Sequence, residues 1–105
     1  MLPSDEALWQ AAAKGHAQSD KIPGLDLHGQ TLAQAMPELE SFLNRQFMAG
    51  ERIVKVICGI GTGRLMAEAE KTLSDYKKSG LVERYIKPFP GVYVAELAEN
   101  GTQQQ

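Results

Sequence analysis

Cysteine is almost absent from this sequence, which contains only Cys58. One thiol cannot form an intramolecular disulfide or a multi-thiolate metal site, so a disulfide-stapled secreted scaffold and a zinc ribbon are both excluded. No stretch approaches the roughly 18 apolar residues of a transmembrane helix, and acidic residues stand near the amino terminus, where a secretory signal needs basic ones. We therefore expect a cytoplasmic protein with no membrane partner.

The chain also lacks a charge imbalance and has few aromatic residues. Its 11 Lys and Arg are set against 13 Asp and Glu, a formal net charge of −2, and aromatic residues make up 7%. Such neutrality argues against tight non-specific binding of DNA at physiological salt, although a local basic cluster can still contact phosphate. What remains is an ordinary globular composition: 105 residues, 43% of them hydrophobic, enough for one compact domain.

Hydrophobic spacing predicts the element order βαβαββ between residues 25 and 97. Strands are expected at 25–29, 53–58, 81–87 and 91–97, with helices between the Thr31–Gln34 capping box and Gly50, and at about 64–79. This order gives an α/β fold, a two-layer sandwich in which a four-stranded mixed sheet has both helices on one face. We expect the first three strands to pair in parallel and the last to return antiparallel.

The two ends of the chain are expected to differ from this core. Residues 1–24 are predicted to form an N-terminal helical extension and a hinge, residues 25–97 the folded domain, and residues 98–105 a disordered polar tail. The sheet face opposite the two helices is then open, or covered only by the N-terminal helix. By strand alternation, Asp26 and His28 point toward that face.

Two segments carry residues that could perform chemistry. Asp26 and His28 share one face at the carboxyl end of a strand, where open α/β sheets bind ligands. Such a pair can serve in acid–base catalysis or hold a divalent metal, or it can simply end the strand at the surface. Residues 59–64 read Gly-Ile-Gly-Thr-Gly-Arg and lead into a helix, so their amides and Arg64 could bind phosphate, or they could form only a tight turn.

Together these motifs resemble the Smr (small MutS-related) domain. Leu-Asp-Leu-His-Gly at 25–29, Gly-Thr-Gly at 61–63 followed by Arg-Leu, and Gly-Val-Tyr-Val at 91–94 occur in the family's order. The resemblance covers residues 25–97 and implies a fold like the carboxyl-terminal domain of translation initiation factor three. It also implies nicking or cleavage of DNA or RNA, with nucleic acid as a partner and the ribosome or a fused or associated repair protein as further candidates.

The resemblance also assigns roles to residues. Asp26 and His28 match the family element associated with cleavage, and either Mg²⁺ or Mn²⁺ could be bound with Asp26 as a ligand. Too few carboxylates are visible for a two-metal mechanism. The residues expected to contact the nucleic-acid backbone are Gly59, Gly61, Thr62, Gly63, Arg64 and Lys55.

Two positions depart from the family pattern. Members usually read His-Gly-x-Gly at the loop, often with a basic x, whereas here Cys58 and Ile60 occupy those places. A cysteine that ends an inner strand is expected to pack in the core and supplies no positive charge.

Three functional hypotheses follow. The leading one is an endonuclease that prefers RNA, branched or single-stranded regions. The second is a binding module that delivers a partner to nucleic acid or the ribosome without cleavage. The third is a protein-interaction domain that uses the N-terminal helix or the open sheet face.

Overall fold

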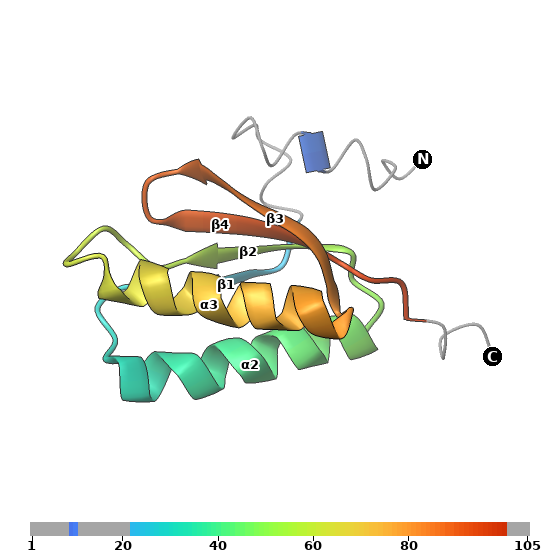
Figure 1. Ribbon diagram of the computed structural model, residues 1–105, viewed down its shortest axis with the longest axis horizontal. Helices are drawn as coiled ribbons and strands as arrows, with labels where there is room; N and C mark the ends of the chain where they lie inside the picture. Colours follow the sequence, from blue (N-terminus) through green and yellow to red (C-terminus); the bar gives the residue numbers. More distant parts are fainter. Residues whose placement is uncertain (1–8, 11–21, 101–105) are drawn as a thin grey trace.

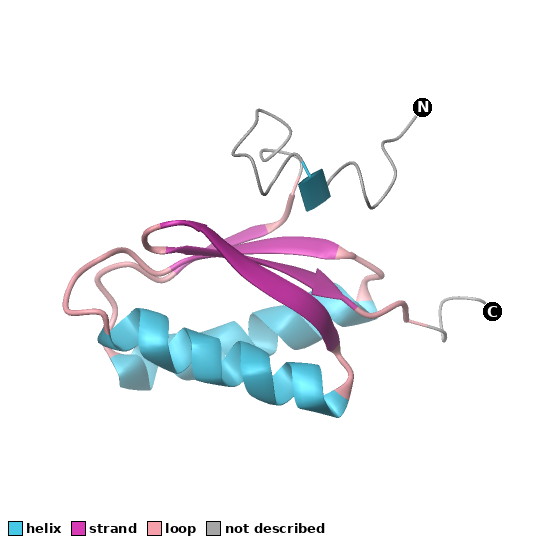
Figure 2. Cartoon of the chain, turned by 45° about the horizontal axis from the view of Figure 1, so that its top comes forward, coloured by secondary structure: helices cyan, strands magenta, loops and turns pink. Residues whose placement is uncertain are grey.

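The structure is a computed structural model that describes residues 9–10 and 22–100. Its elements, in chain order, are β1 (Gly24–Asp26), α2 (Leu32–Met48), β2 (Ile53–Ile57), α3 (Arg64–Ser79), β3 (Val82–Phe89) and β4 (Val92–Leu97). The strands form one sheet, and α2 and α3 lie side by side under one of its faces (Figure 1, Figure 2). The expected βαβαββ order and two-layer α/β arrangement are confirmed.

The strand order of the sheet is β1-β2-β4-β3. β1 pairs with β2 in parallel, and β4 pairs antiparallel with both β2 and β3. The expectation that the first three strands pair in parallel is therefore wrong for β3, because β4 lies between it and β2. The burial pattern gives the reason: most of β4 is buried, as suits a central strand, whereas in β3 only Val82 is buried, as suits an edge.

Local sequence signals set the ends of both helices. At the start of α2, the Thr31 Oγ1 accepts a hydrogen bond from the Gln34 backbone N–H at 3.2 Å, and Gln34 Oε1 accepts one from the Thr31 N–H at 3.0 Å. Gly50 and Gly80, which follow the two helices, have φ of 84° and 96°, a left-handed conformation that glycine adopts without steric cost. The predicted capping box and both helix stops are confirmed.

The main core lies between the helices and the sheet. Its fully buried side chains come from α2, from the turn before it, and from β2, α3 and β4. They include Leu27, Leu39, Leu43, Val54, Val56, Leu73 and Leu97. This packing fixes the carboxyl ends of β1 and β2 and the amino ends of α2 and α3 at one end of the molecule (Figure 1).

A second, smaller cluster covers part of the opposite sheet face. Trp9 is only 5% exposed and packs with Ile22, Ile53 and Val94. The guanidinium carbon of Arg84 lies 4.1 Å from the centre of the Trp9 ring, a cation–π geometry. Trp9 and Gln10 are helical, while the rest of the expected N-terminal helix lies outside the described residues.

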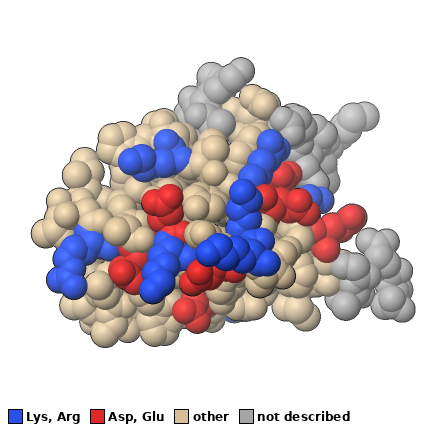
Figure 3. Space-filling view, viewed as in Figure 1, with Lys and Arg blue, Asp and Glu red and all other residues tan. Residues whose placement is uncertain are grey.

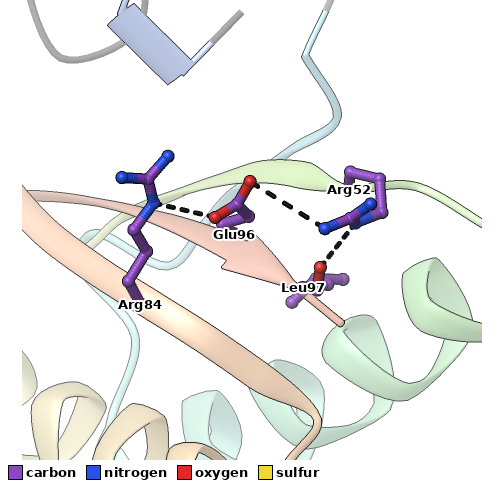
Figure 4. A network of polar contacts seen from close by, with 4 residues as sticks. All are labelled: Arg52, Arg84, Glu96 and Leu97. Atoms are coloured by element: carbon purple, nitrogen blue, oxygen red, sulfur yellow. Dashed lines mark hydrogen bonds and ion pairs between the residues drawn. The ribbon is translucent and has the colours of Figure 1, made fainter. Parts of the chain in front are cut away.

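Charged side chains surround this second cluster in a connected network. Arg84 Nε donates to Glu96 Oε1 at 2.8 Å, and Arg52 Nη2 lies 3.9 Å from Glu96 Oε2 (Figure 4). Arg52 Nε also donates to the Leu97 carbonyl at 2.7 Å (Figure 4). These partners join β3, β4 and the segment before β2, so the face that seemed open carries a specific structure of its own.

The folded part extends beyond the boundary expected at Leu97. Ala98 donates its backbone N–H to the Leu81 carbonyl at 2.8 Å, and the Asn100 side chain, 4% exposed, donates to the Phe47 carbonyl at 3.1 Å. Residues 101–105 of the expected disordered tail lie outside the described part. In that described part, neither helix combines the length and the apolar character that crossing a bilayer requires.

Candidate functional site

Asp26 and His28 form a direct pair at the end of β1. His28 Nδ1 lies 2.6 Å from Asp26 Oδ1, and the same oxygen accepts the His28 backbone N–H at 3.1 Å. The second bond forms a local turn directly after the ladder, which continues as far as the Leu27 N–H bonded to the Ile57 carbonyl at 2.7 Å. β1 stops at Asp26, short of the expected boundary at residue 29, and His28 lies in the following turn.

The pairing sets the charge of Asp26 and the orientation of the His28 ring. Hydrogen bonding from His28 lowers the pKa of Asp26 below its ordinary value of 3.8, so the carboxylate is ionised and can only accept. The Nδ1–H of His28 therefore donates to Asp26, and Nε2 is the ring nitrogen turned away from the carboxylate. The His28 side chain is 69% exposed, so Nε2 is open to a substrate.

The loop between β2 and α3 lies directly against His28. A Cβ placed on Gly59 would come within 3.0 Å of the His28 Cβ, and φ at Gly59 is 75°. Gly61 and Gly63 also have positive φ, of 39° and 85°. Only glycine combines this backbone conformation with such a close approach, so the Gly-x-Gly-x-Gly pattern is what places the loop beside the histidine.

A glycine outside this loop holds it in place. Gly91, in the turn between β3 and β4, accepts through its carbonyl the backbone N–H groups of Cys58 at 2.7 Å and Gly59 at 3.2 Å. A Cβ on Gly91 would lie 3.0 Å from the carbonyl carbon and oxygen of Gly59. From the sequence, Gly91 belongs to the Gly-Val-Tyr-Val motif and a predicted strand, but this role is not visible there, since the contact joins segments far apart in the chain.

The two segments enclose a groove of about 580 Å³ at this end of the molecule. One wall is the turn from His28 to Leu32, and the other is the loop from Cys58 to Leu65. Gln30, a residue not singled out from the sequence, also lines it, and its buried Oε1 has no hydrogen-bond partner among residues 9–10 and 22–100. The size falls within the usual range of about 300–1,000 Å³ for small-ligand sites.

Most of the predicted backbone-contacting residues meet at this groove. Gly59, Gly61, Thr62, Gly63 and Arg64 all line it. Thr62 Oγ1 accepts the Arg64 backbone N–H at 3.3 Å, and the exposed Arg64 begins α3, whose amino end carries partial positive charge. Lys55 is placed elsewhere: it pairs with Gly24 and alternates with Val54 and Val56, so it points to the sheet face away from the helices.

Cys58 behaves as expected for a core residue. Its side chain is 4% exposed and packs in the main hydrophobic cluster. Burial raises the pKa of the Cys58 thiol to about 11, so the thiol is neutral at physiological pH. It offers the groove neither a nucleophilic thiolate nor a charge.

The donor set does not fit a resident metal ion. Asp26 Oδ1 already accepts two N–H groups, which leaves one carboxylate oxygen beside one imidazole. Across residues 9–10 and 22–100, no three His, Cys, Asp or Glu side chains come together as a metal site would require. Binding of Mg²⁺ or Mn²⁺ stays a prediction.

The surrounding surface mixes charges of both signs. On the face seen in Figure 3, Lys and Arg alternate with Asp and Glu, and no broad patch of one sign covers it. A surface of this kind does not generate the strong basic field typical of non-specific duplex binders.

Comparison with known proteins finds similar sequences and structures. A family model described as the Smr domain matches residues 25–89. Endonuclease MutS2 of Caldanaerobacter subterraneus is 39% identical over 77 residues, which are 71% of this chain and 10% of that protein. Endonuclease MutS2 of Aquifex aeolicus is 39% identical over 59 residues, 56% of this chain and 8% of that protein. The chain thus spans about a tenth of the length of these curated relatives.

Solved structures agree with the fold. The Smr domain of Thermus thermophilus MutS2 superposes with a TM-score of 0.66 at 28% identity, covering 73% of this chain and 99% of that one. The SMR domain of NEDD4-binding protein 2 gives a TM-score of 0.52 at 25% identity, covering 74% and 88%.

Proposed function

Because the chain belongs to the Smr domain family, we propose that it is an endonuclease that cleaves phosphodiester bonds in RNA or DNA, with a preference for single-stranded or structured regions. The observation that carries this proposal is the 2.6 Å contact between Asp26 and His28 at the wall of a groove whose opposite wall is the glycine loop. The relatives named endonuclease MutS2 support the same class of activity.

In the proposed reaction, His28 is the proton acceptor. Its free Nε2 takes the proton of an attacking water or hydroxyl as the new oxygen–phosphorus bond forms, and the protonated ring can then donate to the leaving oxygen. The Asp26 carboxylate holds the ring through Nδ1 and stabilises the positive charge that the ring gains. This arrangement resembles the carboxylate–histidine half of a serine-protease triad in its physical logic.

The opposite wall is proposed to hold the phosphate. The glycine loop and the amino end of α3 line the groove. Gly59, Gly63 and Arg64 already donate their backbone N–H groups to the Gly91 carbonyl, the Ile60 carbonyl and Thr62 Oγ1. The phosphate would therefore be held by other amides of the loop and by the Arg64 guanidinium, which can donate two hydrogen bonds to one phosphate. Such groups stabilise the charge that develops on the phosphoryl oxygens in the transition state. The reaction requires no step through a metal ion.

Cleavage assays with matched variants test this proposal. Labelled single-stranded RNA, duplex RNA, single-stranded DNA and supercoiled plasmid are each incubated with Mg²⁺, Mn²⁺ or EDTA. We expect His28→Ala and Asp26→Asn to lower the cleavage rate by about 10²-fold or more, the usual contribution of an acid–base group. Asp75→Asn, which changes another exposed aspartate but on α3, should cleave normally. Equal rates in all four proteins would reject the assignment.

The binding-module hypothesis is the second candidate. It is favoured by the two loop positions that differ from the family pattern. The neutral, buried Cys58 and the apolar Ile60 stand where family members usually place a histidine and often a cation. This hypothesis predicts salt-sensitive binding that Arg64→Ala weakens, with no turnover on any of the four substrates. Nucleic acid is the proposed partner in both cases.

A further inference from the structure

Ile60 stands out among the groove residues because it is apolar and 71% exposed. It lies between Gly59 and Gly61, whose positive φ angles set the shape of the loop without help from the Ile60 side chain. The side chain is also absent from both hydrophobic clusters of the described residues. The Ile60 side chain therefore contributes little to the stability of the fold, and it lines the same groove as His28.

The groove thus offers two kinds of contact. Loop amides and Arg64 suit a charged phosphate, whereas the Ile60 side chain has no donor and cannot bind one. A nucleotide has the same two parts, a charged phosphate and a base with apolar faces. We propose that Ile60 contacts the face of an unpaired nucleobase next to the scissile phosphate, which would make single-stranded nucleic acid with an unstacked base the substrate class. This inference rests on the proposed function.

Duplex nucleic acid does not fit this contact. In a duplex, neighbouring base pairs cover both faces of each base, so an apolar side chain reaches a base face only by unstacking a base step, which costs free energy. In single strands, loops and bulges, bases can turn outward and pack on protein side chains without that cost. The weak net charge of the chain adds to the argument, because electrostatic attraction alone supplies little affinity here.

Binding to two oligomers that differ only in their bases tests the proposal. A single-stranded thymidine oligomer and an abasic oligomer of equal length and charge are titrated by fluorescence anisotropy, in a His28→Gln background to prevent cleavage. The quantity of interest is the ratio of the two dissociation constants. We expect Ile60→Ala to reduce the preference for the base-containing oligomer about fivefold, and Ile60→Leu to retain it.

Two control variants separate this effect from others. Met48→Ala removes another exposed apolar side chain, 61% exposed, about 24 Å along α2 from the groove, and should leave the ratio unchanged. Arg64→Ala should lower the affinity for both oligomers by the same factor, because it removes a phosphate contact. Ile60→Ala should melt at the parent temperature, since an exposed side chain contributes little to stability.

The outcomes distinguish the inference from the proposed function. If Ile60→Ala leaves the ratio of the two dissociation constants unchanged, or lowers the affinity for both oligomers equally, the base contact is overturned and the endonuclease proposal stays intact. Failure of the parent protein to bind either oligomer, together with no cleavage by the wild type, overturns both. In the wild-type background, Ile60→Ala should slow cleavage in an RNA hairpin loop more than in its stem.

Discussion

At the scale of single residues, Asp26 performs two tasks with one oxygen atom. Its Oδ1 accepts the backbone N–H of His28, which forms the turn after β1, and the ring Nδ1–H of the same residue, which orients the imidazole. The two interpretations left open by the sequence, a strand-ending surface pair and a catalytic pair, are therefore compatible. The turn that ends the strand is also what brings the ring onto the carboxylate.

The lowered pKa of Asp26 gives a prediction that requires no substrate. We expect the Asp26 carboxyl carbon, followed by NMR during an acid titration, to show a pKa below 3.8 in the wild type and a higher pKa in His28→Ala. The substitution removes the side-chain hydrogen bond, which is the largest cause of the lowered pKa, and keeps the backbone N–H donor of residue 28. The same shift makes stability depend on pH. Because the pKa of Asp26 is lower in the folded than in the unfolded protein, the pair stabilises the fold above the unfolded-state pKa, and this stabilisation is lost as the pH falls through the folded-state pKa.

An exposed aspartate again serves as the control for that titration. In Asp75→Asn, which changes an exposed aspartate on α3, the pKa of Asp26 should stay as low as in the wild type. Equal pKa values for Asp26 in both proteins would mean that the pair does not form in solution.

The site residues differ in how well the sequence reveals them. Asp26, His28 and the glycine loop are recognisable because their interactions are local or follow a spaced motif. The burial of Cys58 follows from its place at the end of an apolar strand. The exposure of Ile60 and the orientation of Lys55 depend on the strands and loops around them, so the residue types alone do not reveal them.

At the scale of elements, the groove is held together by three backbone segments in contact. The β3–β4 turn packs through Gly91 on Gly59, and Gly59 packs on His28. A Cβ added to Gly59 would lie about 3.0 Å from the His28 Cβ, and one added to Gly91 would lie about 3.0 Å from the Gly59 carbonyl. A side chain at either glycine would therefore push the segments apart. The hairpin thereby positions the glycine loop without lining the groove itself.

Two glycine-to-alanine substitutions test the packing of Gly91 on Gly59. Gly91→Ala adds both the cost of a left-handed alanine and a clash with the Gly59 backbone, so we expect it to lower the unfolding free energy by about 3 kcal/mol. Gly80→Ala has a similar φ but nothing within 4 Å of the new Cβ, so we expect a loss of about 1 kcal/mol. Denaturant unfolding measures both.

Activity separates the two glycines further. Gly91→Ala should also lower cleavage at temperatures where it is folded, because the loop shifts from His28, whereas folded Gly80→Ala should cleave normally. If both variants lost the same stability and kept the same activity, the hairpin would not position the loop.

Helices and strands also differ in what the sequence reveals about them. The Thr31–Gln34 capping box and Gly80 mark helix ends through contacts within a few residues, and the predicted helix 64–79 matches α3. Strand order depends on pairing between distant segments. In β4 the sequence signal for a central strand is the apolar run Val92–Ala95, whereas β3 carries the charged residues Glu83, Arg84 and Lys87, which suit an edge strand.

At the scale of the whole molecule, the groove occupies one end of a small and nearly neutral body. For the proposed nucleic-acid binding, we expect phosphate contacts to be few and local, since charges of both signs are interspersed on the face drawn in Figure 3. The second cluster around Trp9 covers part of the sheet face that a partner protein was expected to use. A nucleic-acid strand that leaves the groove can run either past Asp26 onto that sheet face, where Lys55 points, or along α3.

The salt dependence of binding distinguishes these two paths. Each phosphate contact on a single strand contributes a slope of about −0.7 to the logarithm of the association constant against the logarithm of salt concentration. We expect Arg64→Ala to make the slope less steep by about 0.7 for any single-stranded oligomer that fills the groove. Lys55→Ala should have the same effect only with oligomers long enough to pass Asp26, because Lys55 lies outside the groove.

Lys78, near the carboxyl end of α3, serves as the control on the other path. Lys78→Ala should leave the slope unchanged at every oligomer length, because a strand crossing the sheet face does not reach that end of the helix. If Lys78→Ala changed the slope for long oligomers and Lys55→Ala did not, the strand would run along α3, and the assignment of Lys55 to the binding surface would be withdrawn. Since all three variants remove one positive charge from an otherwise unchanged chain, the comparison isolates where that charge is needed.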